Sequence, residues 1–275
     1  MRNRQQLLHN PEKAVIDSHT YPENWGIQPI LFNIGGFGVP AYPFFVLLGL
    51  AAGIAWFVVD IRKSGHRNGN GLVIATGAIA GGIIGAKLFE WVLNYRFLFE
   101  HFSDPNVWLS GRTIVGGLIG GKIGAVLTKR AYGIRERRGN EIAPAVALGM
   151  LIGRFGCFFR GCCYGTPTNL PFGVNFGDGI LRHPTQLYES LFMLGLFIWL
   201  VYRKRQGDLA PGRLFSLLML WYFTFRFGIE FIRIEPVVFA GLTSFQLISA
   251  VVVLYFGWIA FARKQNREEN YAGES

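Results

Sequence analysis

Charged residues are scarce in this chain. Only 16% of the 275 residues are Asp, Glu, Lys or Arg, against roughly 25% in an average soluble domain. Hydrophobic residues make up 51%, and the mean hydropathy is +0.31. Apolar runs of about 20 residues recur along the whole length. This composition excludes a disordered or collagen-like chain, and it indicates a membrane protein rather than a single soluble core.

Acidic residues are the scarcer of the two charge types. The chain has 17 of them against 27 Lys and Arg, which gives a net charge of +10 and a pI near 9.8. A basic balance can indicate nucleic-acid binding, but here the basic residues gather in short segments between apolar runs. We therefore expect no nucleic-acid partner.

Hydropathy predicts an all-α polytopic membrane protein with seven spans. They cover residues 41–59, 72–93, 113–128, 142–159, 185–202, 214–232 and 242–262. Residues 1–26 have no 7-residue apolar core, so they do not read as a secretory signal. The expected organisation is an external N-terminal tail or arm (1–40), a seven-helix membrane domain that would hold the catalytic site (41–262) and a disordered cytoplasmic tail (263–275).

The segments between the spans alternate in basic content. Fifteen Lys and Arg fall in the segments 62–67, 129–138, 203–213 and 263–267, whereas eight fall in the opposite, longer set. The positive-inside rule assigns the first set to the cytoplasm. The N-terminus is then outside and the C-terminus inside, as an odd number of spans requires.

A few ionisable residues fall inside the predicted spans. Each costs roughly 2.5 to 3.5 kcal/mol at membrane depth, so such a group indicates a functional site unless the side chains reach the surface. The residues are Lys87, Glu90, Lys122, Arg154, Glu189, Arg226 and Glu230.

Two spans carry glycines four residues apart. Gly77, Gly81 and Gly85 lie in the second span, and a similar series from Gly116 to Gly124 lies in the third. This spacing puts glycines on one helix face and lets two backbones approach closely. We expect these two helices to pack together.

The sixth span has the most informative polar pattern. Tyr222, Arg226, Glu230 and Arg233 are spaced by four, four and three residues, so on a helix they form one stripe. Such a stripe faces protein or a wet cavity, not acyl chains. Glu230 is close enough to both arginines to hold them. The alternative is an ion-pair network that only fixes helix packing.

All three cysteines lie at the external end of the fourth span. Cys157, Cys162 and Cys163 fall within seven residues, but no CxxC pair exists and the nearest histidine is His183. A zinc site is therefore a weak alternative. A disulfide between Cys157 and one of the other two fits an oxidising compartment. A packing or disulfide role ranks first, and a redox or catalytic role stays open.

An external loop rich in Pro and Gly precedes the fifth span. It ends in His183 and Pro184, and Pro184 marks a helix start. Thr185, Tyr188 and Glu189 then share a polar face that enters the membrane.

Together these motifs resemble the prolipoprotein diacylglyceryl transferase family. The match rests on residues 183–189, on 153–156 with Gly161 and Gly165, on 115–120, on 222–233, and on 241–243 with Gln246 and Ser249. It runs in order from about Tyr42 to Ser249.

The resemblance implies an enzyme of the cytoplasmic (inner) membrane that acts at the outer leaflet. Such enzymes transfer the diacylglyceryl group of phosphatidylglycerol to the lipobox cysteine thiol in the signal peptide of a preprolipoprotein, and glycerol phosphate leaves. The site must hold the phosphate and stabilise charge on the leaving group, tasks that suit guanidinium groups. We therefore expect Arg154 and Arg226 to clamp the phosphate.

The resemblance also implies the roles of other residues. Catalytic residues are then Arg154, Arg226, Tyr42, Tyr222 and Glu230, and Glu230 orients Arg226 and Arg233. No metal or cofactor is expected. Expected substrate-binding residues are Arg233, His183, Gln186, Tyr188, Glu189, Gly161, Gly165 and Gln246.

The chain departs from the family pattern at four positions. Val115 replaces a histidine proposed as general base, Cys157 and Cys162 replace Asn and Glu, and Pro43 replaces glycine. Either the incoming thiol needs little help, or this branch uses another acceptor. Transient transfer to a cysteine of the chain is a further alternative. Besides a diverged lipid or phosphoglycerol transferase, a lipid-binding or redox-sensing protein without turnover stays open.

Overall fold

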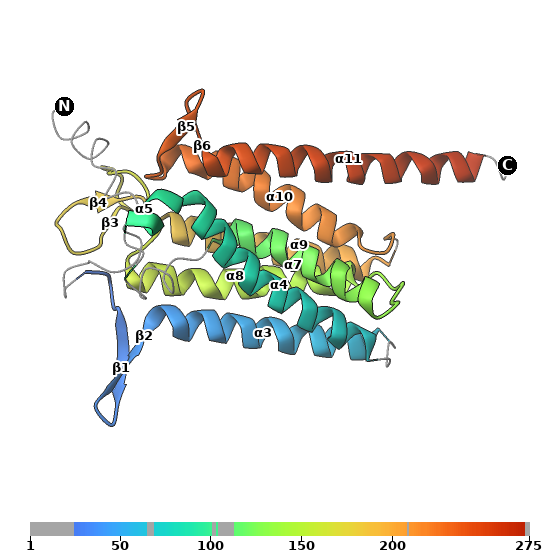
Figure 1. Cartoon of the computed structure of the whole chain (residues 1–275), viewed down its shortest axis with the longest axis horizontal. Helices are drawn as coiled ribbons and strands as arrows, with labels where there is room; N and C mark the ends of the chain where they lie inside the picture. Colours follow the sequence, from blue (N-terminus) through green and yellow to red (C-terminus); the bar gives the residue numbers. More distant parts are fainter. Residues whose placement is uncertain (1–24, 65–68, 101–102, 104–112, 208, 273–275) are drawn as a thin grey trace. The chain divides into compact units, whose positions relative to one another are not determined.

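The computed structural model describes residues 25–64, 69–100, 103, 113–207 and 209–272. The predicted tail at residues 1–24 lies outside the described residues. Helices dominate, as the hydropathy predicts (Figure 1). The chain divides into two compact units. Of the described residues, the first contains those within 69–136 and 235–238, and the second contains those within 25–64, 137–234 and 239–272.

The first unit is built on two long helices, α4 (Asn70–Leu93) and α7 (Ile114–Ala131), with a short helix, α5 (Tyr95–Glu100). The glycine series meet directly. A Cβ on Gly81 would lie 2.5 Å from the carbonyl oxygen of Gly120, and one on Gly85 would lie 2.5 Å from that of Gly116. The two backbones therefore touch with no side chain between them, which confirms the prediction that these helices pack together.

The second unit contains the remaining long helices: α3 (Ala41–Lys63), α8 (Gly139–Arg160), α9 (Thr185–Arg205), α10 (Arg213–Ile229) and α11 (Ser244–Ala272). Helix α8 packs against α3, α9 and α10, and α10 also packs against α9 and α11. The α3–α8 contact is again close, because a Cβ on Gly49 would lie 2.5 Å from the carbonyl oxygen of Gly149. Helices α3, α9 and α11 thus pack around the central pair α8 and α10.

Among the described residues, pairs of short strands precede three of these helices, and two of these pairs are antiparallel. Strands β1 (Ile30–Ile34) and β2 (Phe37–Pro40) lead into α3. Strands β3 (Val174–Asn175) and β4 (Leu181–Arg182) come before α9. Strands β5 (Val237–Phe239) and β6 (Leu242–Thr243) come before α11.

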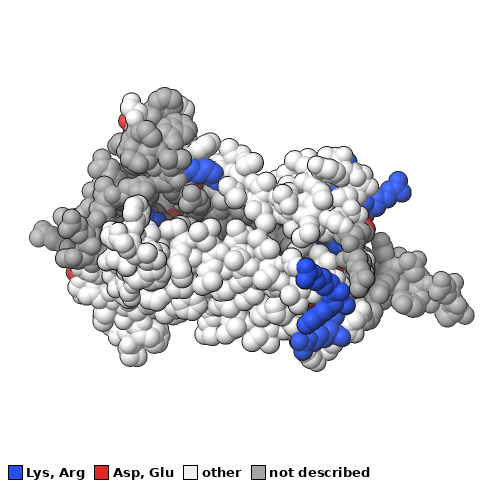
Figure 2. All heavy atoms as spheres, turned by 90° about the horizontal axis from the view of Figure 1, so that it is seen from below, with Lys and Arg blue, Asp and Glu red and all other residues white. Residues whose placement is uncertain are grey.

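Within the part of the chain that the structure describes, five helical segments are long and apolar enough to cross a membrane, which makes this a polytopic membrane protein. They are Ala41–Lys63, Asn70–Leu93, Gly139–Arg160, Thr185–Arg205 and Arg213–Ile232, and Ser244–Ile259 is a shorter apolar helix. Large apolar side chains such as Leu254 and Trp258 lie exposed on the surface. Figure 2 shows a broad stretch of surface without charged residues, beyond which Lys and Arg side chains gather.

The seventh predicted span begins and ends differently in the structure. Leu242 and Thr243 belong to β6, so the helix begins at Ser244 rather than at Leu242. Helix α11 continues to Ala272, so the expectation of a disordered tail is wrong for residues 263–272. The reason is composition, because Ala, Arg, Lys, Gln and Glu in this segment are good helix formers.

Candidate functional site

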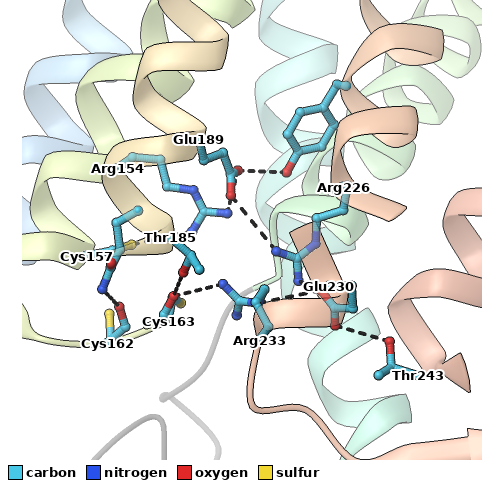
Figure 3. A network of polar contacts seen from close by, with 12 residues as sticks. Arg154, Cys157, Cys162, Cys163, Thr185, Glu189, Arg226, Glu230, Arg233 and Thr243 are labelled. Carbon is cyan, nitrogen blue, oxygen red and sulfur yellow. Dashed lines mark hydrogen bonds and ion pairs between the residues drawn. The ribbon is translucent and has the colours of Figure 1, made fainter. Parts of the chain in front are cut away.

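The centre of the site is an ion pair between α8 and α9. Arg154 lies near the end of α8, and Glu189 lies in the second turn of α9. Their side chains are buried, and Arg154 Nη2 lies 2.5 Å from Glu189 Oε1 (Figure 3). A buried carboxylate needs such a partner, because burial of an unpaired charge is very costly.

Helix α10 adds two groups to the same carboxylate. The hydroxyl of Tyr222, which is fully buried, donates a hydrogen bond of 3.0 Å to Glu189 Oε1. One turn further on, Arg226 Nη1 lies 4.0 Å from Glu189 Oε2. Glu189 thus joins α8, α9 and α10, and it brings Arg154 and Arg226 to one place. The predicted convergence of these two arginines is confirmed.

A second carboxylate, that of Glu230, holds the other side of Arg226. Arg226 Nη2 lies 2.9 Å from Glu230 Oε2, and Arg233 Nε lies 3.5 Å from the same oxygen. Both predicted ion pairs are present. The predicted continuous helical stripe is wrong, however, because α10 ends at Ile229, Glu230–Ile232 form a 3-10 turn, and Arg233 is extended. An antiparallel bridge between Arg233 and Gly165 draws the chain out of the helix.

The start of α11 is tied to this carboxylate by Thr243. Its hydroxyl donates a 3.2 Å hydrogen bond to Glu230 Oε1 and accepts one of 3.2 Å from the backbone N–H of Gln246. Gln246 Oε1 accepts a hydrogen bond of 3.0 Å from the backbone N–H of Thr243. This is a capping box, in which residues N-cap and N3 satisfy each other's backbone donors. The sequence analysis missed it, although the Thr-x-x-Gln pattern before an apolar run is its signal.

The network brings five charged side chains together. They are three guanidinium groups (Arg154, Arg226, Arg233) and two carboxylates (Glu189, Glu230). Among the described residues, Arg154 Nε and Arg226 Nη1 are buried and make no hydrogen bond. Buried N–H groups on a cation suit an anionic ligand, and guanidinium groups match phosphate oxygens in geometry.

Three other predicted residues have contacts of their own. Tyr42, near the start of α3, has its ring 5.4 Å from the guanidinium carbon of Arg160. His183 Nδ1 lies 3.2 Å from the hydroxyl of Tyr188. These two contacts involve neither Arg154 nor Arg226, so they do not join the three residues to the arginine network.

Residues 161–165 form a turn that the predicted site residues fix in place. Gly161 ends α8 with φ +76°, a left-handed conformation that favours glycine. Gln186 Nε2 donates to the carbonyl of Cys162 at 2.5 Å. Gly165 has no room for a side chain, since a Cβ there would lie 2.5 Å from the carbonyl oxygen of Ile232. These three residues support the turn beside Arg154.

The three cysteines, Cys157 at the end of α8 and Cys162 and Cys163 in this turn, lie close together without a disulfide. The disulfide that the sequence suggested is therefore wrong for this structure. The sulfur atoms all lie within 4.8 Å of one another, and Arg154 Nη1 lies 3.8 Å from Cys157 Sγ. Hydrogen bonds with Cys157 and Cys163, together with burial, raise the pKa of the Cys162 thiol well above its ordinary value. A protonated thiol is a poor nucleophile, which argues against transfer to Cys162.

An ion pair that the sequence analysis missed fixes the loop before α9. Arg182 Nη1 and Nη2 each lie 2.6 Å from an oxygen of Asp178. The guanidinium carbon of Arg182 also lies 4.9 Å from the ring of Tyr164 and 5.8 Å from that of Trp25. The hydrogen bonds from Arg182 lower the pKa of the Asp178 carboxyl. This pairing holds β4 in the position from which α9 begins.

Fold and site define a polytopic membrane protein with a buried cluster of Arg and Glu between helices. Residues 29–262 match the family model of prolipoprotein diacylglyceryl transferase, and the chain belongs to this family. The resemblance drawn from the sequence is thereby confirmed.

Similar proteins cover most of the chain. It is 32% identical over 218 residues to the phosphatidylglycerol–prolipoprotein diacylglyceryl transferase of Clostridium tetani, which covers 76% of this chain and 87% of that protein. Proteins of the same name from Gloeobacter violaceus (33% over 259 residues, 88% and 95%) and Methylococcus capsulatus (32% over 258 residues, 86% and 94%) are similar as well.

Proposed function

We propose that this chain transfers the diacylglyceryl group of phosphatidylglycerol to the lipobox cysteine of preprolipoproteins. Relatives that bear the name of this activity match the chain over most of their length. The observation that carries the proposal is the meeting of Arg154 and Arg226 on Glu189, with buried N–H groups left over. The chain thus has a cationic site for the phosphate of an anionic lipid.

The proposed chemistry is a displacement at a CH2 carbon of the lipid. The thiolate sulfur forms a bond to that carbon, the carbon–oxygen bond to phosphate breaks, and glycerol phosphate leaves with the electron pair. The thiol proton goes to a base or to solvent. Arg154 and Arg226 hold the phosphate and stabilise the negative charge that develops on it. Tyr222 and the two carboxylates orient the guanidinium groups and are proposed as parts of the same site.

Other predicted residues keep their proposed roles in binding. Arg233 lies on Glu230 and completes the cationic side of the site. We propose that Tyr42, His183 and Tyr188 face the bound substrates, whereas Gln186 and Gln246 act through the backbone segments that they fix. The glycines at 161 and 165 let the turn approach the network closely.

We further propose seven spans in the cytoplasmic membrane, an external N-terminus and a site toward the outer leaflet. Basic residues fill the last turns of α3 and α9. An ion pair between Asp60 and Lys204 joins these two helix ends. The arginine network lies near the end of α8 and near the start of α9, so on α9 it is at the other end from the basic last turn. If basic ends face the cytoplasm, the network lies near the external surface. The same rule supports spans at α7 and α11.

This chain departs from the family pattern at the residue that would take the proton from the thiol. Val115 is buried on α7 and has no titratable group. A small thiolate fraction already exists near neutral pH, so the proposed acceptor does not require a dedicated base. The same departure is what favours the second candidate, transfer of a lipid or phosphoglycerol group to another acceptor.

The test uses the full chain purified in detergent, phosphatidylglycerol and a lipobox peptide. We expect a thioether-linked diacylglyceryl peptide by mass spectrometry. Consumption of the lipid without peptide modification would favour the second candidate. Lipid that stays bound without turnover would favour a binding protein.

A matched pair of variants tests the role of the guanidinium group. Arg226→Lys keeps the charge but loses the two-pronged donor geometry, so we expect at least a tenfold loss of turnover with an unchanged fold. Arg62→Lys, at the exposed end of α3, is the control and should have the activity of the wild type. Full activity of Arg226→Lys would contradict the proposed clamp.

A further inference from the structure

We propose that Cys157, Cys162 and Cys163 form a binding site for a thiophilic metal ion, namely monovalent copper. The three side chains converge at the end of α8, where the helix passes into the turn at 161–165 (Figure 3). This group borders the proposed transfer site, because Arg154 lies 3.8 Å from Cys157 Sγ, but metal binding by the thiols does not depend on the transfer reaction.

The sulfur atoms are already close to a coordinating arrangement. They all lie within 4.8 Å of one another. Three sulfurs around one ion at a metal–sulfur distance of about 2.3 Å lie about 4.0 Å apart in a trigonal plane. Each sulfur therefore needs to move inward by no more than about 0.5 Å, on the same geometry. Small side-chain rotations supply such a shift without a change of backbone.

The backbone that carries these cysteines is fixed from several sides. The carbonyl of Cys163 accepts hydrogen bonds from Thr185 Oγ1 at 2.5 Å and from Arg233 Nη1 at 2.9 Å. The carbonyl of Cys162 is held by Gln186. A rigid support of this kind preorganises ligands and keeps them from collapsing into another arrangement.

The backbone conformation of Cys163 is unfavourable for a residue with a side chain, which supports a functional role for this thiol. Its φ is +62°, in the left-handed region that favours glycine. A side chain in this conformation costs about 1 kcal/mol or more. With this conformation, the Cys163 sulfur lies in the group with the other two.

The donor set selects the ion. Among the described residues, the close group contains three sulfur ligands and no histidine or carboxylate. Zinc in a structural site normally takes four protein ligands, whereas soft thiolates favour monovalent copper, for which three sulfurs suffice. Binding converts three thiols to thiolates and releases three protons to solvent. The resulting complex carries two negative charges, and its nearest guanidinium group is that of Arg154, with Nη1 3.8 Å from Cys157 Sγ.

The experiment measures copper binding by the reduced full chain in detergent, without oxygen. Monovalent copper is supplied alone, in competition with the chelator bicinchoninate. We expect one ion per chain, and X-ray absorption should show three sulfur neighbours. Replacement of any single cysteine by serine should lower the affinity at least tenfold. Ser190→Ala, at a buried position on α9 outside the group, is the control and should bind as the wild type does.

A second measurement needs no variant. Cys163 is the half-buried thiol of the three, and copper should protect it from maleimide in the wild-type chain, as mass spectrometry of the labelled peptide can show. Binding no stronger than that of a chain with all three cysteines replaced would overturn the proposal. So would coordination by two sulfurs, with Cys163 still labelled, or uptake of zinc in preference to copper.

Discussion

Replacement of Glu189 by glutamine tests the central connection of the site. The carboxylate meets Arg154 at 2.5 Å, Arg226 at 4.0 Å and the hydroxyl of Tyr222 at 3.0 Å. Glutamine keeps the size and one acceptor oxygen but removes the charge. If its oxygen faces Arg154, its amide N–H groups face Arg226, so two donors oppose each other.

The size of the effect follows from the geometry. At 4 Å and an effective dielectric constant of about 20, a pair of unit charges interacts by about 4 kcal/mol. Removal of one partner from a buried pair costs about 3 to 5 kcal/mol. We expect a loss near the lower limit, about 3 kcal/mol in the free energy of unfolding, because glutamine still accepts one hydrogen bond. A similar loss of transition-state stabilisation corresponds to roughly 100-fold slower turnover.

The assay compares formation of the diacylglyceryl peptide with thermal unfolding in detergent. Glu141→Gln is the matched control, because Glu141 is also a buried carboxylate on a helix but lies at the other end of α8. It should keep turnover. Glu189→Asp keeps the charge and should recover part of the activity that Glu189→Gln loses. Wild-type turnover and stability of Glu189→Gln would refute the reasoning.

Three further predictions concern the supports of the site and fold. Gly120→Ala places a Cβ 2.4 Å from a carbonyl oxygen of the facing helix and should lower the unfolding midpoint, whereas Gly195→Ala, with open space, should not; equal midpoints would contradict this. The pKa of Asp178 is lowered by Arg182, so their pairing should stabilise the loop above the ordinary aspartate pKa and be lost as pH falls through the lowered value; tryptophan fluorescence should follow this transition, and Asp178→Asn should abolish it. Thr243→Val removes a cap worth about 1 kcal/mol and should lower both the midpoint and turnover; an unchanged turnover would show that the cap is independent of the site.

The sequence predicted the helices well, because their hydropathy and spacing are local properties. The glycine series also predicted a contact between two helices, since only backbone approach explains glycines on one face. The ends were harder. Helix α10 ends at Ile229 because the next segment pairs with a distant residue, Gly165. No local pattern shows such a partner.

For the site, the sequence identified most of the residues but not their arrangement. An ionisable residue within an apolar span indicates a site, and this rule found Arg154, Glu189 and Arg226. It assigned Glu189 to substrate binding, whereas the structure shows that it joins both arginines. The thiol group was visible as a short spacing, but the absence of a disulfide depends on the turn at 161–165. Such tertiary contacts join residues far apart in the chain.

The capping box of α11 has a mechanical consequence. The hydroxyl of Thr243 starts the helix and also holds the carboxylate that positions Arg226. A tilt of α11 that moves Thr243 therefore shifts Glu230, and the guanidinium group of Arg226 moves with it.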